Sequence, residues 1–285
     1  MSKAKNIKTP ILIILLAVFL FSAAMTVRQQ LQYRQIDADS LEAARIAGLN
    51  RQEAAPRRSA GPQPSAAPQP SAAPQPSAAA SASEQPESLP EEAAELLSID
   101  LEALQNINED VVGWITIPGT ELSYPLVQGA DNQFYLSHSW KREASIGGAV
   151  FLEVTNSRDL SDFHTIVYAH QMRNDSMFGS LKYYNSLDYL REHPSIYLAA
   201  GGAIYRYDIF SAQKAGIKSI VYRLDLEEKH LENEFFQWCL DNSVIDTGLN
   251  PSAGDQVLTL STCVGNDRAN RWVVSAVLRN VWAAA

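Results

Sequence analysis

Apolar and polar positions are distributed very unevenly along this chain, and the longest apolar stretch lies near its N-terminus. Residues 11–27 read ILIILLAVFLFSAAMTV, 17 residues without a charge. Such a run is just long enough to cross a bilayer as a helix, and the lysines before it favour a cytoplasmic N-terminus. We therefore expect a cytoplasmic tail over 1–9 and a transmembrane helix over 10–27. A cleaved signal peptide is the alternative, because segment 22–24 offers small residues to a peptidase.

A polar stretch and a biased stretch follow the apolar run. From Arg28 to Gln52 the apolar residues are too sparse to build a core, so we expect a loose helix or no structure there. From Ala54 to about Gln85 the chain consists mostly of Ala, Pro, Gln and Ser, with three near-copies of AAPQPS. This composition buries too little apolar surface to offset backbone entropy. We predict an extracellular linker over 28–87, with a Pro-rich docking segment as the alternative.

Patterning typical of a folded domain begins at Ser88, and its first elements should be helical. Ser88 with Pro90 and Glu91 forms a helix-start signal, and Asp100 is placed to cap a second short helix. Two later segments have helical spacing. They are residues 176–190, and residues 225–240, where Asp225 and Glu228 could form a capping box.

The rest of residues 88–285 consists of short runs rich in β-branched and aromatic residues, separated by Gly, Pro, Asn and Asp. Such runs predict a mainly β domain, either a closed barrel or a sandwich. The runs are GWITIPG, ELSYPLVQ, GGAVFLE, HTIVYAH, SIYLAAG, AIYRYDIFSAQ, QVLTLSTC and RWVVSAVLRN.

Charge and cysteine content exclude several classes of function. The net charge is -9 and the pI is about 5.1, which argues against binding nucleic acid, because phosphate contacts need clustered Lys and Arg. Two cysteines are too few for a disulfide framework, and their surroundings lack metal-ligand spacing. We expect no metal and no cofactor. The cysteine content is compatible with a single reactive thiol.

Cys263 is the candidate for that thiol. It ends the strand-like run VLTLSTC and precedes the polar loop VGNDRANR, so it lies where a side chain can face a cleft. The residue by itself fits a small buried hydrophobe at least as well. Cys239 lies within FFQWCL on the amphipathic segment 225–240, where packing in the core is the better interpretation.

His170 and Arg271 are the candidate partners of Cys263. Acyl transfer by cysteine needs a proton donor for the departing amine and a positive group where oxyanion charge develops. His170 closes the run HTIVYAH, although a half-exposed loop histidine is an equally good interpretation. Arg271 begins a strand after the loop that follows Cys263, whereas Arg268 lies in mid-loop. Among the other histidines, His164 is the rival, and three are expected at the solvated surface: His138, His193 and His230.

Three ordered motifs give a closer match. TLSTC, followed eight residues later by the arginine of RWVV, resembles the active-site signature of the sortases. YAHQMRNDSMFGSLKYY and GWITIPGTELSYPLVQGADNQFYL resemble the histidine segment and the domain opening of sortase class B. The resemblance covers about residues 110–280, and the segment 226–240 is similar to an extra helix of that class.

The resemblance implies an eight-stranded sortase β-barrel on the outside of a Gram-positive cell. Its substrates would be secreted proteins with a C-terminal sorting signal. Cys263 would attack the carbonyl after the signal's threonine, His170 would protonate the leaving amine, and Arg271 would hold the signal and stabilise the oxyanion. An amine from a peptidoglycan precursor or a pilin lysine would then resolve the thioester. Peptide bonds are conserved, so no ATP is needed.

Three further positions match places where class B enzymes contact the signal: Ser261, Tyr168 and Asn132. Class B relatives can carry an acidic residue directly after the cysteine, where this chain has Val264. Two other hypotheses are retained. One is a secreted cysteine endopeptidase that passes the thioester to water, and the other is a non-catalytic wall-binding module built on an exported β-barrel.

Overall fold

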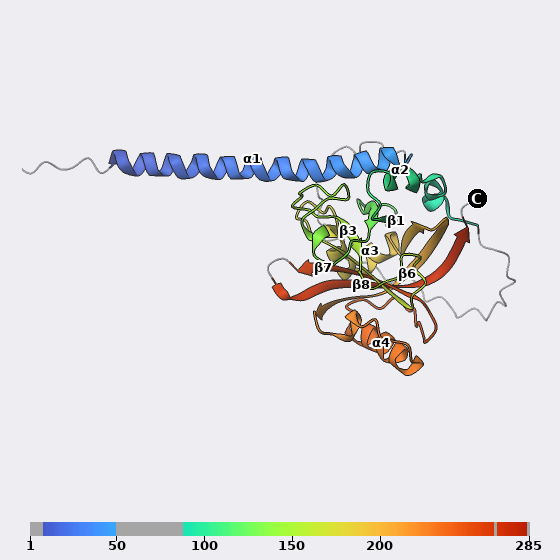
Figure 1. Ribbon diagram of the computed structural model, residues 1–285. Helices are drawn as coiled ribbons and strands as arrows, with labels where there is room; N and C mark the ends of the chain where they lie inside the picture. The colour runs from blue at the N-terminus through green and yellow to red at the C-terminus, as the bar shows by residue number, and fades with distance from the viewer. Residues whose placement is uncertain (1–7, 50–87, 265–266, 284–285) are drawn as a thin grey trace, which may run out of the picture.

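Eight strands form the body of the protein (Figure 1). The computed structural model describes residues 8–49, 88–264 and 267–283. The strands are β1 Val111–Thr116, β2 Ser123–Val127, β3 Val150–Leu152, β4 His164–Ala169, β5 Ser195–Ala200, β6 Ala203–Gly216, β7 Val257–Val264 and β8 Asp267–Ala283. They close into a barrel in the order β1-β2-β3-β4-β7-β8-β6-β5. The expected eight-stranded barrel is therefore confirmed.

Two of the strand pairs are parallel, β2 with β3 and β4 with β7, and the others are antiparallel. A parallel pair needs a long crossover connection. The connection from β4 to β7 contains β5, β6 and α4 Lys229–Asn242. The carboxyl ends of β4 and β7 consequently lie at the same end of the barrel.

Short helices precede the barrel and connect its strands. They are η1 Glu91–Ser98, α2 Leu101–Gln105, η2 Phe134–Leu136, η3 Gly179–Asn185, α3 Leu187–Glu192 and η4 Ile220–Tyr222. Asp100 caps α2 as expected, because its Oδ1 accepts the Ala103 N–H at 2.9 Å. The helix-start signal at Ser88 makes no cap, since the N-cap of η1 is Pro90 and has no side-chain hydrogen bond.

The expected capping box of α4 is wrong. The helix begins after Glu228, whose side chain makes no capping hydrogen bond. The carboxylate of Asp225 instead accepts from the Arg223 guanidinium, with 3.0 Å between Oδ1 and Nε. A local ion pair therefore replaces the cap.

The core has an inner and two outer parts. Apolar side chains from all eight strands fill the barrel, and Ile115, Leu198 and Leu260 among them are fully buried. On one outer side, α4 lays Phe235, Phe236 and Cys239 against β6, β7 and β8. A third cluster lies under η1, α2 and the first helix of the chain.

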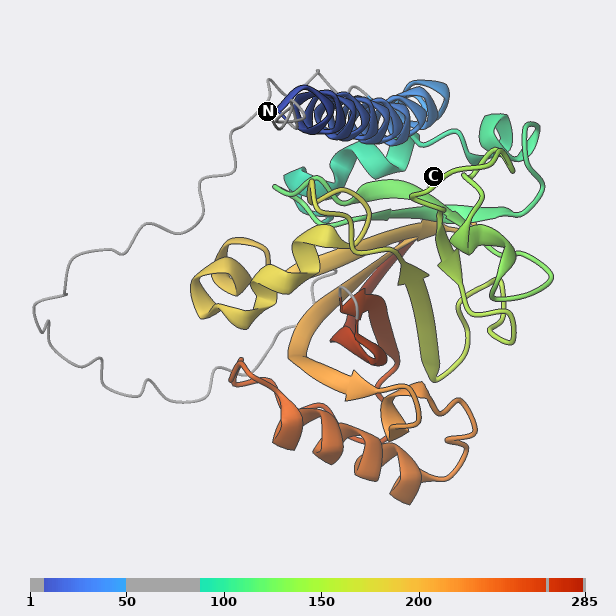
Figure 2. The same ribbon diagram turned by 90° about the vertical axis from the view of Figure 1, so that its left-hand side faces the viewer.

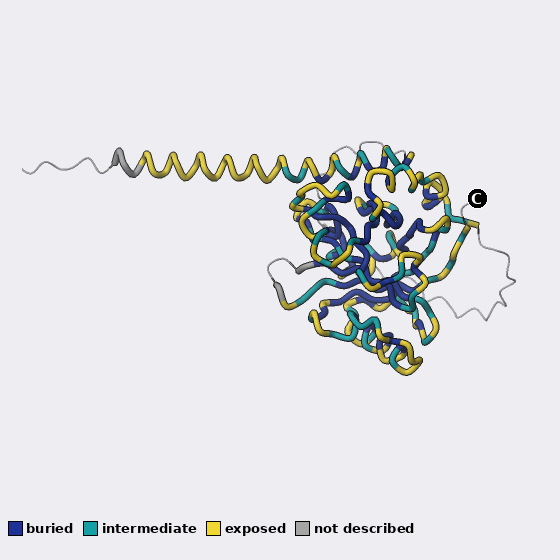
Figure 3. Tube along the Cα trace, in the orientation of Figure 1, coloured by how far each residue is buried: buried dark blue, intermediate teal, exposed yellow. Residues whose placement is uncertain are grey.

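That first helix, α1 Lys8–Ile46, is a single rod of 39 residues. Its N-terminal part projects away from the barrel and its C-terminal part lies along it, as the exposure pattern in Figure 3 shows. Ile36, Ala43, Ala44 and Ala47 are buried against the barrel and its neighbouring helices. The expectation of a loose helix or no structure from Arg28 to Gln52 is therefore wrong for residues 32–49. Alanines carry little hydrophobic signal in a sequence, although they allow close helix packing.

The expected Pro-rich linker lies mostly outside the described residues, which resume at 88. Its two flanks meet at one place, because the Asp100 N–H donates to the Ala47 carbonyl at 3.0 Å. The residues before and after the linker thus belong to the same cluster on the barrel.

Candidate active site

The predicted catalytic residues lie on three neighbouring strands. Ala169 on β4 pairs in register with Thr262 on β7, and each immediately precedes one of the candidates, His170 and Cys263. Cys263 in turn pairs with Arg271 on β8. Neighbouring strands lie about 4.8 Å apart, so the backbone brings all three positions to one end of the barrel. The side chain of Cys263 is outside the described part of the chain.

His170 directly follows the end of β4, and its ring contacts η2. Its Nε2 lies 2.7 Å from the Leu136 carbonyl oxygen of η2. A carbonyl only accepts, so Nε2 carries a proton in this arrangement. The His170 carbonyl accepts the Phe178 N–H at 3.0 Å, which closes the loop after β4. The ring is therefore held from η2 and its backbone from the loop.

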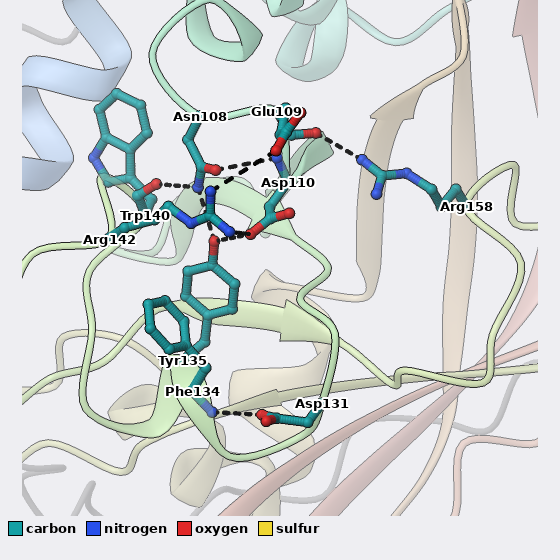
Figure 4. A network of polar contacts seen from close by, with 9 residues as sticks. All are labelled: Asn108, Glu109, Asp110, Asp131, Phe134, Tyr135, Trp140, Arg142 and Arg158. Carbon is teal, nitrogen blue, oxygen red and sulfur yellow. Dashed lines mark hydrogen bonds and ion pairs between the residues drawn. The ribbon is translucent and has the colours of Figure 1, made fainter.

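A polar network fixes η2 in place (Figure 4). The Tyr135 hydroxyl donates to Asp110 Oδ2 at 2.6 Å and accepts from Asn108 Nδ2 at 2.8 Å. Asn108 also donates to the Trp140 carbonyl at 2.6 Å, and Arg142 pairs with Asp110 at 3.2 Å. Because Leu136 follows Tyr135 directly, this network indirectly positions the carbonyl that holds His170.

Tyr168 and Asn132, two of the three predicted substrate contacts, share one partner. The partner is Glu153, a buried carboxylate just after β3. Its Oε2 accepts from the Tyr168 hydroxyl at 2.9 Å, and its Oε1 accepts from Asn132 Nδ2 at 2.6 Å. Asn132 Oδ1 accepts the Val154 N–H at 2.9 Å. Glu153 was not anticipated from the sequence, where it appeared only as the last residue of a strand-like run.

The Tyr168 phenol stays protonated. Burial raises its pKa, and the Glu153 carboxylate raises it further, whereas the Arg271 guanidinium lowers it. The effect of Arg271 means that its charge lies near the phenol. Arg271 is half-buried, and its Nη1 donates to the Asn270 carbonyl at 3.0 Å. One cation and one buried anion therefore flank Tyr168.

Ser261, the third predicted contact, is 1% exposed and lies two residues before Cys263. It pairs in register with Tyr168 across β4 and β7. Its hydroxyl lies 2.9 Å from the Tyr222 hydroxyl at the end of η4. Tyr222 was also missed from the sequence, because nothing in the local pattern links it to β7. The three predicted contacts thus lie together beside the candidate catalytic positions.

His164, the rival histidine, has a structural environment. Its Nε2 lies 2.8 Å from Thr259 Oγ1 and its Nδ1 lies 2.9 Å from the Arg223 carbonyl. Burial lowers the pKa of His164 to about 4, so the ring is neutral at physiological pH. It lies at the opposite end of β4 from His170.

The remaining histidines differ in part from expectation. His230 is exposed, as expected. His138 and His193 are half-buried, and each Nδ1 lies within 2.9 Å of a backbone carbonyl. The expectation of a solvated surface is wrong for these two, because tertiary contacts cover them.

Cys239 is a core residue, as expected. It is fully buried on the inner face of α4, and burial raises the pKa of its thiol to about 12. The thiolate is the reactive form of cysteine, so this thiol is inert. Among residues 8–49, 88–264 and 267–283, no group of three or more His, Cys, Asp or Glu side chains is placed to hold a metal ion.

Comparison with known proteins identifies relatives of this arrangement. A family model described as the sortase domain matches residues 115–279, a range that includes all three candidate catalytic positions. Sortase B of Listeria monocytogenes is 34% identical over 164 residues, covering 58% of this chain and 67% of that protein. Sortase B of Staphylococcus aureus is 33% identical over 162 residues, covering 57% of this chain and 66% of that protein.

Solved structures show the same likeness. A Staphylococcus aureus sortase B–substrate complex superposes with a TM-score of 0.60 at 32% identity, covering 63% of this chain and 84% of that one. Clostridium perfringens sortase B superposes with a TM-score of 0.59 at 29% identity, covering 64% of this chain and all of that one. The fold of the barrel is therefore shared with these proteins.

Proposed function

The chain belongs to the sortase family, in its class B, and on that premise we propose how this cell-wall sorting transpeptidase uses its own residues. Cys263 is the nucleophile, His170 the general acid, and Arg271 the oxyanion-stabilising group. The observation that carries the assignment is the register of β4, β7 and β8. Thr262, which precedes Cys263, pairs with Ala169 at the end of β4. Cys263 itself pairs with Arg271 on β8.

The reaction proceeds in two steps. The Cys263 thiolate attacks the carbonyl carbon after the signal's threonine, and the tetrahedral oxyanion forms near the Arg271 guanidinium. The carbon–nitrogen bond breaks as His170 donates a proton to the departing amine, which leaves a thioester. A second amine attacks the thioester and gives up a proton to His170, and the thiolate leaves. One peptide bond is broken and one amide is formed.

His170 donates from Nδ1 in this scheme. Nε2 holds its proton against the Leu136 carbonyl, so the second proton of the imidazolium resides on Nδ1. The active form is a thiolate beside an imidazolium.

The sorting signal binds beside Ser261, Tyr168 and Asn132. What supports this is their proximity to the catalytic positions and the charges around them. Tyr168 and Ser261 pair in register two residues before His170 and Cys263. The hydroxyls of Ser261 and Tyr222 lie 2.9 Å apart, which joins η4 to β7 beside the catalytic positions. Val264 replaces an acidic residue found in relatives, so a signal contact through that position differs here.

The N-terminal helix supports a membrane location. One window of α1 has a mean hydropathy of 2.0 and is wholly exposed, and α1 is a candidate membrane anchor. The N-terminus lies in the cytoplasm and the barrel outside. The donor substrates are secreted proteins with a C-terminal sorting signal, and the acceptor is an amine of a peptidoglycan precursor or of a pilin.

A peptide library tests the chemistry. The full chain in detergent is incubated with peptides that carry five-residue signals containing threonine, with and without triglycine. Mass spectrometry should find an acyl adduct on Cys263, and an amide product only when triglycine is present. Hydrolysis alone, even with triglycine, would support the endopeptidase instead.

Two variants make the test specific. Cys263→Ala should abolish adduct and product, whereas Cys239→Ala should keep both, because that thiol is buried and protonated. If the unmodified protein forms no adduct with any peptide of the library, the result contradicts the proposed function and favours a non-catalytic wall-binding module.

A further inference from the structure

The projecting and docked parts of α1 meet within about one helical turn. The apolar run ends at Val27, and the first partly buried residues are Gln32 and Tyr33. Residues 28–31, three polar residues followed by the exposed Leu31, therefore form the whole segment between them. At 1.5 Å per residue they span about 6 Å. The polar headgroup region on one side of a bilayer is of similar thickness.

The docked part of α1 is held firmly. Ile36 packs so closely on Gly147 that a Cβ added there would lie 2.7 Å from Ile36 Cδ1. The Trp140 indole N–H donates to the Asp39 carbonyl at 3.1 Å. Lys141 Nζ lies 3.2 Å from Asp39 Oδ1 and 3.0 Å from Glu42 Oε2. Apolar packing and a charge cluster therefore join the rod to the barrel.

The candidate catalytic end of the barrel points the same way as the free part of α1. Figure 1 shows the end of β7 and the start of β8 on the side toward which α1 projects, and this side faces the viewer in Figure 2. Side-chain contacts also connect α1 to the loop that follows β4. Met177, in the loop that begins at His170, lines a crevice together with Ile36 and Tyr124. Its N–H donates to the Tyr124 hydroxyl at 2.9 Å. The turn between β5 and β6 and the end of β8 lie at the opposite end.

We propose that the barrel lies directly on the outer face of the cell membrane, with its catalytic end facing the lipid headgroups. The proposal rests on the membrane anchorage and the site residues of the proposed function. Because α1 is continuous and docked, it sets both the distance and the orientation. Ile217 fits this placement, since it is 52% exposed at the end of β6 beside the exposed Lys218. An apolar side chain next to a lysine suits an interfacial environment.

The Pro-rich segment then does not set the reach of the enzyme. Both of its flanks are fixed on the barrel through the contact between Asp100 and Ala47. A chain that leaves and returns to one cluster adds no distance between membrane and barrel. The site would meet sorting signals and acceptors that lie within the headgroup layer.

Fluorescence quenching tests the orientation. Ile217→Cys and Val281→Cys are matched, because both are aliphatic side chains about half exposed, at opposite ends of the barrel. Each is made in the full chain with Cys263→Ala and labelled with a fluorophore, and buried Cys239 stays unlabelled. The chains are reconstituted in vesicles that carry nitroxide headgroups. Quenching should be several-fold stronger at 217 than at 281. Equal or reversed quenching in a chain that sediments with the vesicles overturns the orientation, and a chain that does not sediment contradicts the anchorage.

A pair of insertions tests the consequence. Eight Gly and Ser residues are placed between Gln30 and Leu31, or between Ala72 and Ala73 as the matched control. Turnover of a vesicle-anchored substrate should fall roughly tenfold with the first insertion, because the effective concentration falls. Turnover of a soluble signal peptide should be unchanged. The control insertion should change neither. A larger effect from the control overturns the proposal, and a parent inactive on the soluble peptide contradicts the proposed function instead.

Discussion

Glu153 offers the sharpest test of how the candidate groove is held. Its carboxylate accepts from Asn132 Nδ2 and from the Tyr168 hydroxyl, and both donors are partly buried. Glu153→Ala leaves the two donors without their acceptor, and each unsatisfied donor costs about 1–3 kcal/mol. Since water can reach part of the space, we expect a loss of about 3 kcal/mol in the free energy of unfolding. Glu153→Gln should lose about 1 kcal/mol, because the amide oxygen still accepts from Asn132 and the Tyr168 hydroxyl can turn to accept from the amide.

Urea unfolding of the full chain in mild detergent, followed by tryptophan fluorescence, measures these losses. With a slope of about 2 kcal/mol per molar urea, the Ala variant should lower the midpoint by about 1.5 M. Glu109→Ala is the control, because that side chain is 86% exposed and its contact with Arg142 is 3.9 Å. Peptide turnover should fall more for Ala than for Gln. If Glu153→Ala lowers the midpoint no further than Glu109→Ala does, the carboxylate is not what holds Tyr168 and Asn132.

Three further predictions concern His164, Phe236 and Tyr222. The pKa of His164 is about 4 when folded and about 6.5 when unfolded, so the unfolded chain binds the extra proton between these values. Stability should therefore fall as the pH drops from about 6.5 to 4, by on the order of 3 kcal/mol, and His164→Gln should flatten this part of a pH series of urea midpoints. Phe236→Ala should lower the free energy of unfolding by about 3–5 kcal/mol, because it removes a buried ring from the inner face of α4. A thermal melt checks this, with the exposed Leu97→Ala as the control. Tyr222→Phe should cost about 1 kcal/mol in stability and raise the KM for peptide, and an unchanged KM would remove Tyr222 from the groove.

The sequence was informative where the signal is local. Asp100 could be recognised as a cap because its partner is three residues away, and the strands could be recognised from runs of β-branched residues. The Asp225 cap failed because a nearby arginine competed for the same carboxylate. Glu153, Tyr222 and the docking of α1 depend on partners far along the chain, which no local pattern records. The candidate site residues rest on ordered motifs, because spacing alone leaves Cys263 and His170 undecided.

The parallel pairing of β4 and β7 links the candidate chemistry to the whole fold. β4 ends at Ala169 and β7 begins at Val257, so the positions that precede His170 and Cys263 come together only across a long crossover. That crossover contains β6, which pairs with β8, and β8 is the strand that brings Arg271 across from Cys263. The three positions therefore cannot be assembled by any one hairpin. Acylation of Cys263 and the tryptophan signal should consequently be lost at the same urea concentration, and acylation that persists beyond the fluorescence transition would show that a smaller part of the barrel suffices.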